Sequence, residues 1–254
     1  MSELEPRQLP LGRLLGSGKE AEVHEYGDCV AKLYKPHALK RSAFREAAIL
    51  AFVESLGLPA PKVEGVGRFG DRWAVLMGRA DGPLFADAMR RDPAAIPAHL
   101  AAMAALHTRI HAAPAEQLAS LKARLAGNIA RATMLNDALR SDLLQRLAAM
   151  PDGDRLCHGD FHPANIAGPL GGETILDWLD ATRGDPLADV CRTYVLIKPV
   201  SAGLAAAYVE AYAALRKVRR DDIMNWTRFV AAARLAEGLP DQVDGLTAMA
   251  GGKD

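Results

Sequence analysis

The sequence predicts an α+β chain with a small antiparallel sheet near its N-terminus and a mostly helical remainder. Two observations predict this order. Short apolar segments separated by Gly-Asp pairs occupy much of the first 77 residues, as is typical of strands joined by tight turns. From Pro83 onward the chain is rich in alanine, the best helix former, and its apolar residues recur at helical spacing. We therefore expect a first part over residues 1–77 and a second part over residues 78–254.

Composition limits the classes of protein to which this chain can belong. Its 254 residues are 50% hydrophobic and 24% charged, enough for a full core in one domain or two small lobes. A formal net charge of +0 gives no electrostatic reason to expect a nucleic acid or an acidic membrane as partner. The three cysteines, Cys29, Cys157 and Cys191, lack metal-type spacing and are expected to be reduced thiols of a cytoplasmic protein. The first residues, Met1 to Pro6, include acidic side chains and are not expected to be a secretory signal. No stretch of the sequence is long and apolar enough to span a bilayer.

Two hairpins and one helix are predicted in the first part. Gly27-Asp28 separates residues 23–26 from residues 29–34, and Gly70-Asp71 separates residues 63–69 from residues 72–77. Residues 39–53 lie between the hairpins and have helical periodicity. Their expected apolar side consists of Ala43, Ala47, Leu50 and either Ala51 or Glu54, with Phe44 and Ala48 beside it.

A glycine-containing loop precedes the first hairpin. Gly16, Ser17, Gly18 and Val23 follow the pattern G-x-G-x-x-G-x-V of a kinase glycine loop, except that Ala21 replaces the third glycine. Glycines let a backbone approach phosphates closely. A simple turn between two strands would explain the same residues.

Two other phosphate-binding loops fit this segment less well. A Walker A loop has four residues between its first glycine and the Gly-Lys pair, whereas five residues separate Gly12 from Gly18. Glu20 also stands where that motif needs Ser or Thr. A Rossmann fingerprint must open a helix, but this loop leads into a predicted strand, turn and strand.

The most specific pattern lies at residues 158–165, His-Gly-Asp-Phe-His-Pro-Ala-Asn, followed by Ile-Leu-Asp-Trp at residues 175–178. Asp160 and Asn165 have the D-x-x-x-x-N interval of a kinase catalytic loop. One carboxylate can orient a hydroxyl group and accept its proton. The oxygens of an amide and of a second carboxylate, Asn165 and Asp177, suit Mg²⁺.

A metal-dependent hydrolase is an alternative interpretation of the same segment. His158, Asp160 and His162 form an H-x-D-x-H pattern with plausible ligand types. That interpretation leaves Asn165 and Asp177 unexplained. His107 and His111 are also four residues apart and could share a metal, but without a third ligand nearby in sequence they are expected to be packed or capping histidines.

These motifs, together with Gly-Asp-Pro-Leu-Ala-Asp-Val at residues 184–190, resemble those of the aminoglycoside phosphotransferase and choline kinase family. The resemblance implies a protein-kinase-like, two-lobed fold, with an N-lobe over residues 1–77 and a C-lobe over residues 78–254. Protein kinases have Arg where this chain has Gly159, and D-F-G where it has Asp177-Trp178-Leu179. Both departures fit the small-molecule kinases.

The resemblance also implies roles for individual residues. The ATP site would consist of Gly16, Ser17, Gly18, Val23, Lys32, Glu46 and Met77. Lys32 would meet the α- and β-phosphates, with Lys35 as second choice, Glu46 would pair with Lys32, and Met77 would begin the hinge beside the adenine. Asp160 would be the catalytic base, Asn165 and Asp177 would bind Mg²⁺, and Asp189 would brace the catalytic loop.

The expected reaction transfers the γ-phosphoryl group of ATP to a hydroxyl of a small molecule, such as an aminoglycoside, an amino alcohol or a sugar. Acids are not in excess over residues 181–254, which disfavours a polycationic acceptor. Trp226 and Phe229 could stack on an acceptor or pack in a core, and a helical stretch from Leu118 to Met150 is expected to wall its site. A catalytically silent nucleotide-binding pseudokinase is the other candidate. It would lack one of the residues assigned to the reaction, yet Lys32, Asp160, Asn165 and Asp177 are all present.

Overall fold

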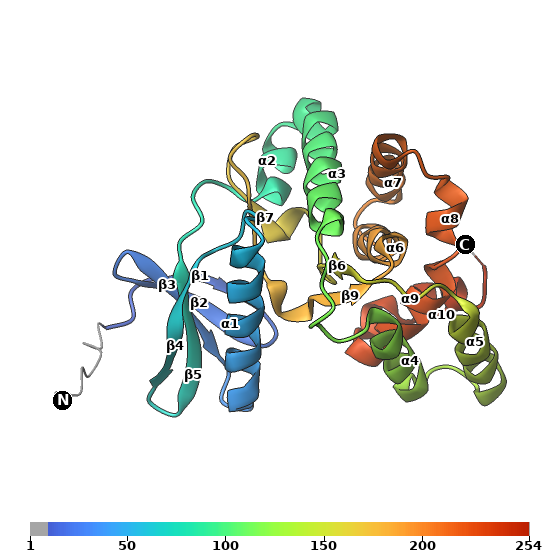
Figure 1. The fold of residues 1–254 in the computed structure, drawn as a ribbon, viewed down its shortest axis with the longest axis horizontal. Coiled ribbons are helices and arrows are strands. Elements are labelled where there is room, and N and C mark those ends of the chain that lie inside the picture. The colour runs from blue at the N-terminus through green and yellow to red at the C-terminus, as the bar shows by residue number, and fades with distance from the viewer. Residues whose placement is uncertain (1–9, 254) are drawn as a thin grey trace. The chain divides into compact units, whose positions relative to one another are not determined.

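The computed structural model describes residues 10–253, so the segment from Met1 to Pro6 lies outside the described residues (Figure 1). The described chain divides into two compact units, one of residues 10–82 and 173–179 and one of residues 83–172 and 180–253. None of the helices in residues 10–253 combines the length and apolar character that a membrane span needs.

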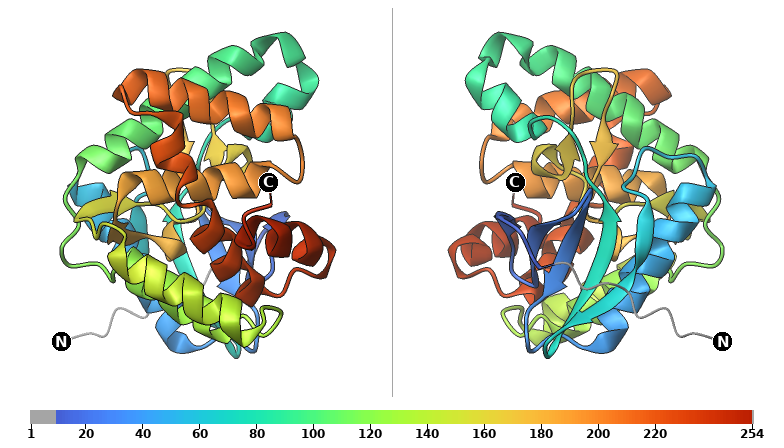
Figure 2. Two further views of the ribbon diagram at one scale, coloured as in Figure 1. Left: turned by 90° about the vertical axis from the view of Figure 1, so that its right-hand side faces the viewer. Right: turned by 90° about the vertical axis from the view of Figure 1, so that its left-hand side faces the viewer.

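The first unit contains a five-stranded antiparallel sheet in the order β1-β2-β3-β5-β4, with helix α1 packed against it (Figure 2). Its elements are β1 (Leu14–Ser17), β2 (Ala21–Tyr26), β3 (Cys29–Tyr34), α1 (Lys40–Ser55), β4 (Val63–Phe69), β5 (Arg72–Gly78) and the short β8 (Thr174–Ile175). Both predicted hairpins are confirmed. Gly27 and Gly70 have positive φ angles of 58° and 61° at the first position of two-residue loops, where type II′ turns need glycine.

The predicted apolar side of α1 was wrong in part. The buried residues are Ala43, Glu46, Ile49, Leu50 and Val53, whereas Phe44, Ala48, Ala51 and Glu54 are exposed and Ala47 is half-buried. The helix is rotated from the expected orientation because Glu46 makes a buried ion pair and so lies within the packed face.

The second unit is mostly helical. Its helices are α2 (Phe85–Arg91), α3 (Ile96–Ala112), α4 (Leu121–Arg131), α5 (Asp137–Ala149), α6 (Pro186–Ile197), α7 (Ala202–Arg216), α8 (Arg220–Met224), α9 (Thr227–Arg234) and α10 (Val243–Ala250). Its strands are β6 (Arg155–Cys157), β7 (Ile166–Ala167) and β9 (Thr182–Gly184). Helices α3 and α7 lie side by side (Figure 1).

The helical stretch predicted from Leu118 to Met150 consists of two helices, α4 and α5, because Ser120 and Asn136 each cap a new helix by accepting a backbone N–H through their side chains. Trp226 and Phe229 are buried and meet edge to face, so they serve the core of this unit.

Candidate functional site

The glycine loop is the turn between β1 and β2. Gly16 pairs with Val23, and Val23 pairs in turn with Lys32, so these residues are neighbours across three adjacent strands. Gly18 donates its backbone N–H to Ala21 at 2.8 Å. A β-carbon built at Gly16 meets no atom within 4 Å, and Ser17 is exposed. The loop backbone is therefore open at the position where phosphate binding is expected.

Lys32 lies between two carboxylates of the first unit. Its Nζ donates to Glu46 Oε1 and to Asp177 Oδ1, each at 2.7 Å. Burial alone would lower the pKa of Lys32, but the two carboxylates raise it above its ordinary value. The expected pairing of Lys32 with Glu46 is confirmed, and β3 brings Lys32 rather than Lys35 to this position.

Tyr34 is part of the same arrangement, and sequence reasoning missed it. Its hydroxyl donates to Glu46 Oε2, so both oxygens of Glu46 are engaged. Burial, followed by the charge of Glu46, raises the pKa of Tyr34 well above its usual range. The signal was available, because residues two apart in a strand share a face, and Lys32 and Tyr34 are two apart in β3.

Asp177 has an unusual backbone conformation. It follows β8 and has a φ angle of 57°, in the left-handed region that residues other than glycine seldom adopt. Ile175 donates its backbone N–H to Pro59 at 2.7 Å, and Trp178 Nε1 donates to Ile175 at 2.9 Å, which holds the segment in place. Such local strain concentrates at functional sites.

Met77 lies within β5, where it pairs with Val30 and Val63. The strand continues through Gly78, whose N–H donates to Lys62 at 2.8 Å. The strand β5 thus extends to Gly78, one residue beyond its predicted end at Met77.

The catalytic-loop motif lies in the second unit and is held by its own side chains. Asp160 donates its backbone N–H to His158 Nδ1 at 3.1 Å, so His158 supports the loop. Asn165 Nδ2 donates to the backbone oxygen and to Oδ2 of Asp160, each at 2.9 Å. His162 Nδ1 accepts the N–H of Ala164 at 3.3 Å, so it also supports the loop.

The charges around Asp160 keep it ionised. Burial opposes its ionisation, but the hydrogen bond and charge of His162 and the charges of Arg192 and His158 outweigh burial. Together they hold the pKa of Asp160 well below its usual range. A carboxylate of such low basicity orients a hydroxyl better than it deprotonates one.

Arg192 and Glu237 are further residues that sequence reasoning missed. Arg192 Nε donates to the backbone oxygen of Gly159, next to Asp160, and its Nη1 lies 2.7 Å from Glu237 Oε1. Burial favours loss of the arginine proton, but Glu237 raises the pKa of Arg192. A charged residue three positions after Asp189 in an apolar helix was the available signal.

Asp189 anchors the catalytic loop from α6. It accepts the backbone N–H of His158 at 2.6 Å and that of Gly159 at 2.9 Å, which confirms the expected brace. Asp185 is the N-cap of the same helix, since it accepts the N–H of Leu187 at 2.8 Å.

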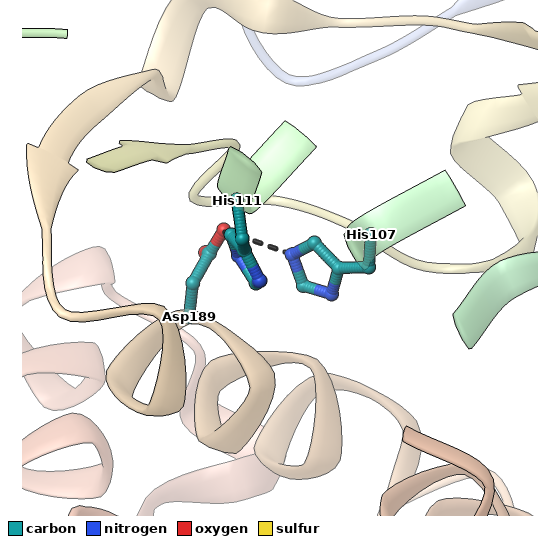
Figure 3. Close-up of side chains that lie close together, drawn as sticks. All are labelled: His107, His111 and Asp189. Carbon is teal, nitrogen blue, oxygen red and sulfur yellow. Dashed lines mark hydrogen bonds and ion pairs between the residues drawn. The ribbon is translucent and has the colours of Figure 1, made fainter. Parts of the chain in front are cut away.

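His107 and His111 are buried, as expected, and turn their rings toward Asp189 (Figure 3). By ligand type these three residues could hold a metal ion. In the part of the chain that the structure describes, His158, Asp160 and His162 form no such group. The geometry therefore gives the metal-hydrolase interpretation of that segment no support.

Comparison with known proteins extends these observations. A family model described as the phosphotransferase enzyme family matches residues 15–221. No curated protein sequence matches the chain.

Solved structures of similar fold include aminoglycoside phosphotransferases. One is a thermostable mutant of aminoglycoside phosphotransferase APH(4)-Ia, with a TM-score of 0.71 at 19% identity, covering 96% of this chain and 92% of that one. Another is aminoglycoside phosphotransferase APH(3'')-Id from Streptomyces rimosus with ADP and streptomycin, with a TM-score of 0.60 at 19% identity, covering 85% and 90%. These likenesses confirm the predicted protein-kinase-like α+β fold.

The family match also confirms the predicted class of enzyme, a small-molecule kinase. Because the match spans most of the 254 residues and includes both the glycine loop and the catalytic-loop motif, the chain belongs to the phosphotransferase enzyme family.

Proposed function

We propose that the protein transfers the γ-phosphoryl group of ATP, in the presence of Mg²⁺, to a hydroxyl group of a small molecule. The observation that carries the proposal is the contact of Lys32 with both Glu46 and Asp177, each at 2.7 Å. A lysine on the third strand, paired with a glutamate of the following helix, is the arrangement that protein kinases use to hold ATP phosphates.

In the first unit, the proposed nucleotide-binding residues are Gly16, Ser17, Gly18, Val23, Lys32, Glu46 and Met77. The open glycine loop would let backbone N–H groups reach the phosphates. Lys32 would pair with phosphate oxygens while Glu46 keeps its side chain extended. The β5 segment that includes Met77 would lie beside the adenine.

Two residues have oxygen atoms suited to Mg²⁺. Asn165 directs its Nδ2 to Asp160, which leaves Oδ1 for a cation, and Asp177 uses Oδ1 for Lys32, which leaves Oδ2. Such hard oxygen donors fit a magnesium ion. When bound, the ion would neutralise phosphate charge.

Asp160 is the proposed catalytic residue. Its depressed pKa keeps it ionised at neutral pH, so it can accept a hydrogen bond from the acceptor hydroxyl and aim that oxygen. The proton of the acceptor hydroxyl would pass to the Asp160 carboxylate only as the bond from that oxygen to the γ-phosphorus forms and the bond from this phosphorus to ADP breaks.

Comparison with solved structures supports a small-molecule acceptor. Similar structures bind hygromycin B and streptomycin. For this chain we propose an aminoglycoside-like, amino alcohol or sugar acceptor.

The proposal is tested by measuring ADP release from MgATP with a panel of aminoglycosides, amino alcohols, sugars and nucleosides, with the Asp160→Ala variant as control. Acceptor-dependent release that the variant lacks is the expected result. MgATP binding without release for any acceptor would instead favour a nucleotide-binding pseudokinase.

A further inference from the structure

The Asp189 carboxylate is the centre of a buried hydrogen-bond cluster. Besides the N–H groups of His158 and Gly159, its Oδ2 lies 2.9 Å from His107 Nε2 and 3.3 Å from His111 Nε2 (Figure 3). Asp189 is 1% exposed, and both imidazoles are also buried. A buried carboxylate is stable only when its oxygens accept hydrogen bonds, and here the two histidines of α3 supply part of those hydrogen bonds.

A second layer of contacts fixes the two imidazoles from α7. Tyr208 Oη lies 2.5 Å from His107 Nδ1, and Tyr212 Oη lies 2.7 Å from His111 Nδ1. The histidines are four residues apart on α3 and the tyrosines four apart on α7, so the pattern repeats once per turn.

The contacts of His107 define its tautomer. Because an ionised carboxylate can only accept, Nε2 must carry the proton that faces Asp189. Burial, followed by the charge of His111, lowers the pKa of His107 to about 3, so the ring is neutral and Nδ1 is an acceptor. Tyr208 must then donate its hydroxyl proton to Nδ1.

The same ring also contacts the catalytic loop directly. His107 stacks on Phe161, with ring centroids 4.2 Å apart and planes at 26°. Phe161 is fully buried and follows Asp160 in the chain. His107 thus touches both the anchor of the loop backbone and the side chain next to Asp160.

We propose that His107, held in one tautomer and orientation by Tyr208, is a positioning residue that sets the conformation of the catalytic loop through Asp189 and Phe161. This inference rests on the proposed function, because the effect of His107 on activity depends on Asp160 being the catalytic residue. The proposal adds residues of two helices, α3 and α7, to those that support catalysis, and both helices lie outside the motifs recognised in the sequence.

A metal ion held by His107, His111 and Asp189 is the competing explanation of the cluster. The hydrogen bonds favour our proposal, because the loop amides already occupy both oxygens of Asp189. A metal on Nε2 of either histidine would also require removal of the proton that now faces the carboxylate.

Three variants separate positioning from packing. Tyr208→Phe removes only the hydroxyl donor. His107→Gln keeps an N–H near the Nε2 position, whereas His107→Leu does not. Tyr194→Phe removes the hydroxyl of another buried tyrosine, on α6, that takes no part in the cluster, and serves as the matched control.

The first measurement is the steady-state rate of the folded fraction of each variant. We expect Tyr208→Phe to lower kcat about two- to tenfold, the effect of one lost hydrogen bond, with the KM for ATP unchanged. His107→Gln should retain much more of kcat than His107→Leu, and Tyr194→Phe should match the wild type.

The second measurement does not depend on turnover. Amide hydrogen exchange of His158 and Gly159 should be faster in Tyr208→Phe than in Tyr194→Phe, and nitrogen-15 spectra should show an unprotonated Nδ1 on His107 of the wild type. Unchanged exchange and unchanged kcat in Tyr208→Phe would overturn the proposal, as would a stoichiometric metal that the purified wild type holds and His107→Leu loses. A wild type without acceptor-dependent ADP release would instead contradict the proposed function, while the exchange rates still test the positioning.

Discussion

The α-carbon of Gly159 faces the backbone carbonyl of Asp180 so closely that a β-carbon built on it would lie 2.4 Å from that oxygen. Gly159 also has a φ angle of 82°, which side chains strongly disfavour. Its N–H is held by Asp189 and its carbonyl by Arg192. Glycine therefore stands where protein kinases have arginine because the loop backbone leaves no room for a side chain.

We predict that Gly159→Ala lowers both stability and activity. Gly171→Ala is the matched control, because Gly171 has a similar φ angle of 88° but a β-carbon there meets nothing within 4 Å. The control should lose about 1–2 kcal/mol, the cost of left-handed backbone strain, whereas Gly159→Ala should lose more and should lose turnover. Urea unfolding and ADP release measure the two effects. Equal losses in the two variants would contradict this account of Gly159.

Asp160→Ala is predicted to abolish turnover while MgATP still binds. The carboxylate is the group proposed to orient the acceptor hydroxyl, and it is not among the proposed ligands of the nucleotide. Isothermal titration with MgATP and an ADP-release assay separate the two properties. Asp154→Ala, which changes an exposed aspartate of the same unit, should behave as the wild type. Full activity in Asp160→Ala would rule out the mechanism.

The proposed metal ligands make a different prediction. Asp177→Ala should abolish turnover, and both Asp177→Ala and Asn165→Ala should weaken binding of the nucleotide in the presence of Mg²⁺. Because the lost oxygens act on the ion, the loss of affinity should shrink when Mg²⁺ is left out. Titrations with and without Mg²⁺ measure the difference. An equal loss of affinity under both conditions would mean that these side chains do not act through the metal.

Glu46→Gln tests the ion pair in the first unit. The amide keeps the shape of the side chain but removes the charge that Lys32 and Tyr34 contact. Since a hydrogen bond to a charged group contributes about 1.5–3 kcal/mol, we expect kcat/KM for ATP to fall roughly ten- to hundredfold. Glu54→Gln, on the exposed side of the same helix, is the control and should change little. Similar values for the two variants would show that the pair does not organise the nucleotide site.

The sequence was most informative where function requires particular residue types at fixed spacing. Gly-Asp turns marked both hairpins, and the catalytic-loop motif placed Asp160 and Asn165 within hydrogen-bonding distance. Contacts between distant segments could not be read in the same way. The buried face of α1 was misjudged because hydrophobic periodicity placed Glu46 only next to the apolar side, and the position of Lys32 explains why Glu46 is buried.

The histidine pair shows the same limit. Their spacing indicated a shared face of α3, and their burial was expected. Their partner Asp189 lies 78 and 82 residues away in sequence, and the tyrosines 101 residues away. No local sequence pattern encodes these contacts, because they depend on how the three helices α3, α6 and α7 pack.

Acid should destabilise the protein through His107. A histidine of the unfolded chain binds a proton near pH 6.5, whereas His107 in the folded protein does so at about 3. Between these values the unfolded state binds more protons, so the free energy of unfolding falls as pH falls, by at most about 1.4 kcal/mol per pH unit for this group. Below about pH 4, the depressed pKa values of Asp160 and Asp189 add their own loss of stability. His107→Gln lacks the titrating ring, so its urea-unfolding free energy should depend less on pH between about 6 and 4. Parallel curves for the variant and the wild type would show that His107 is not held neutral by its surroundings.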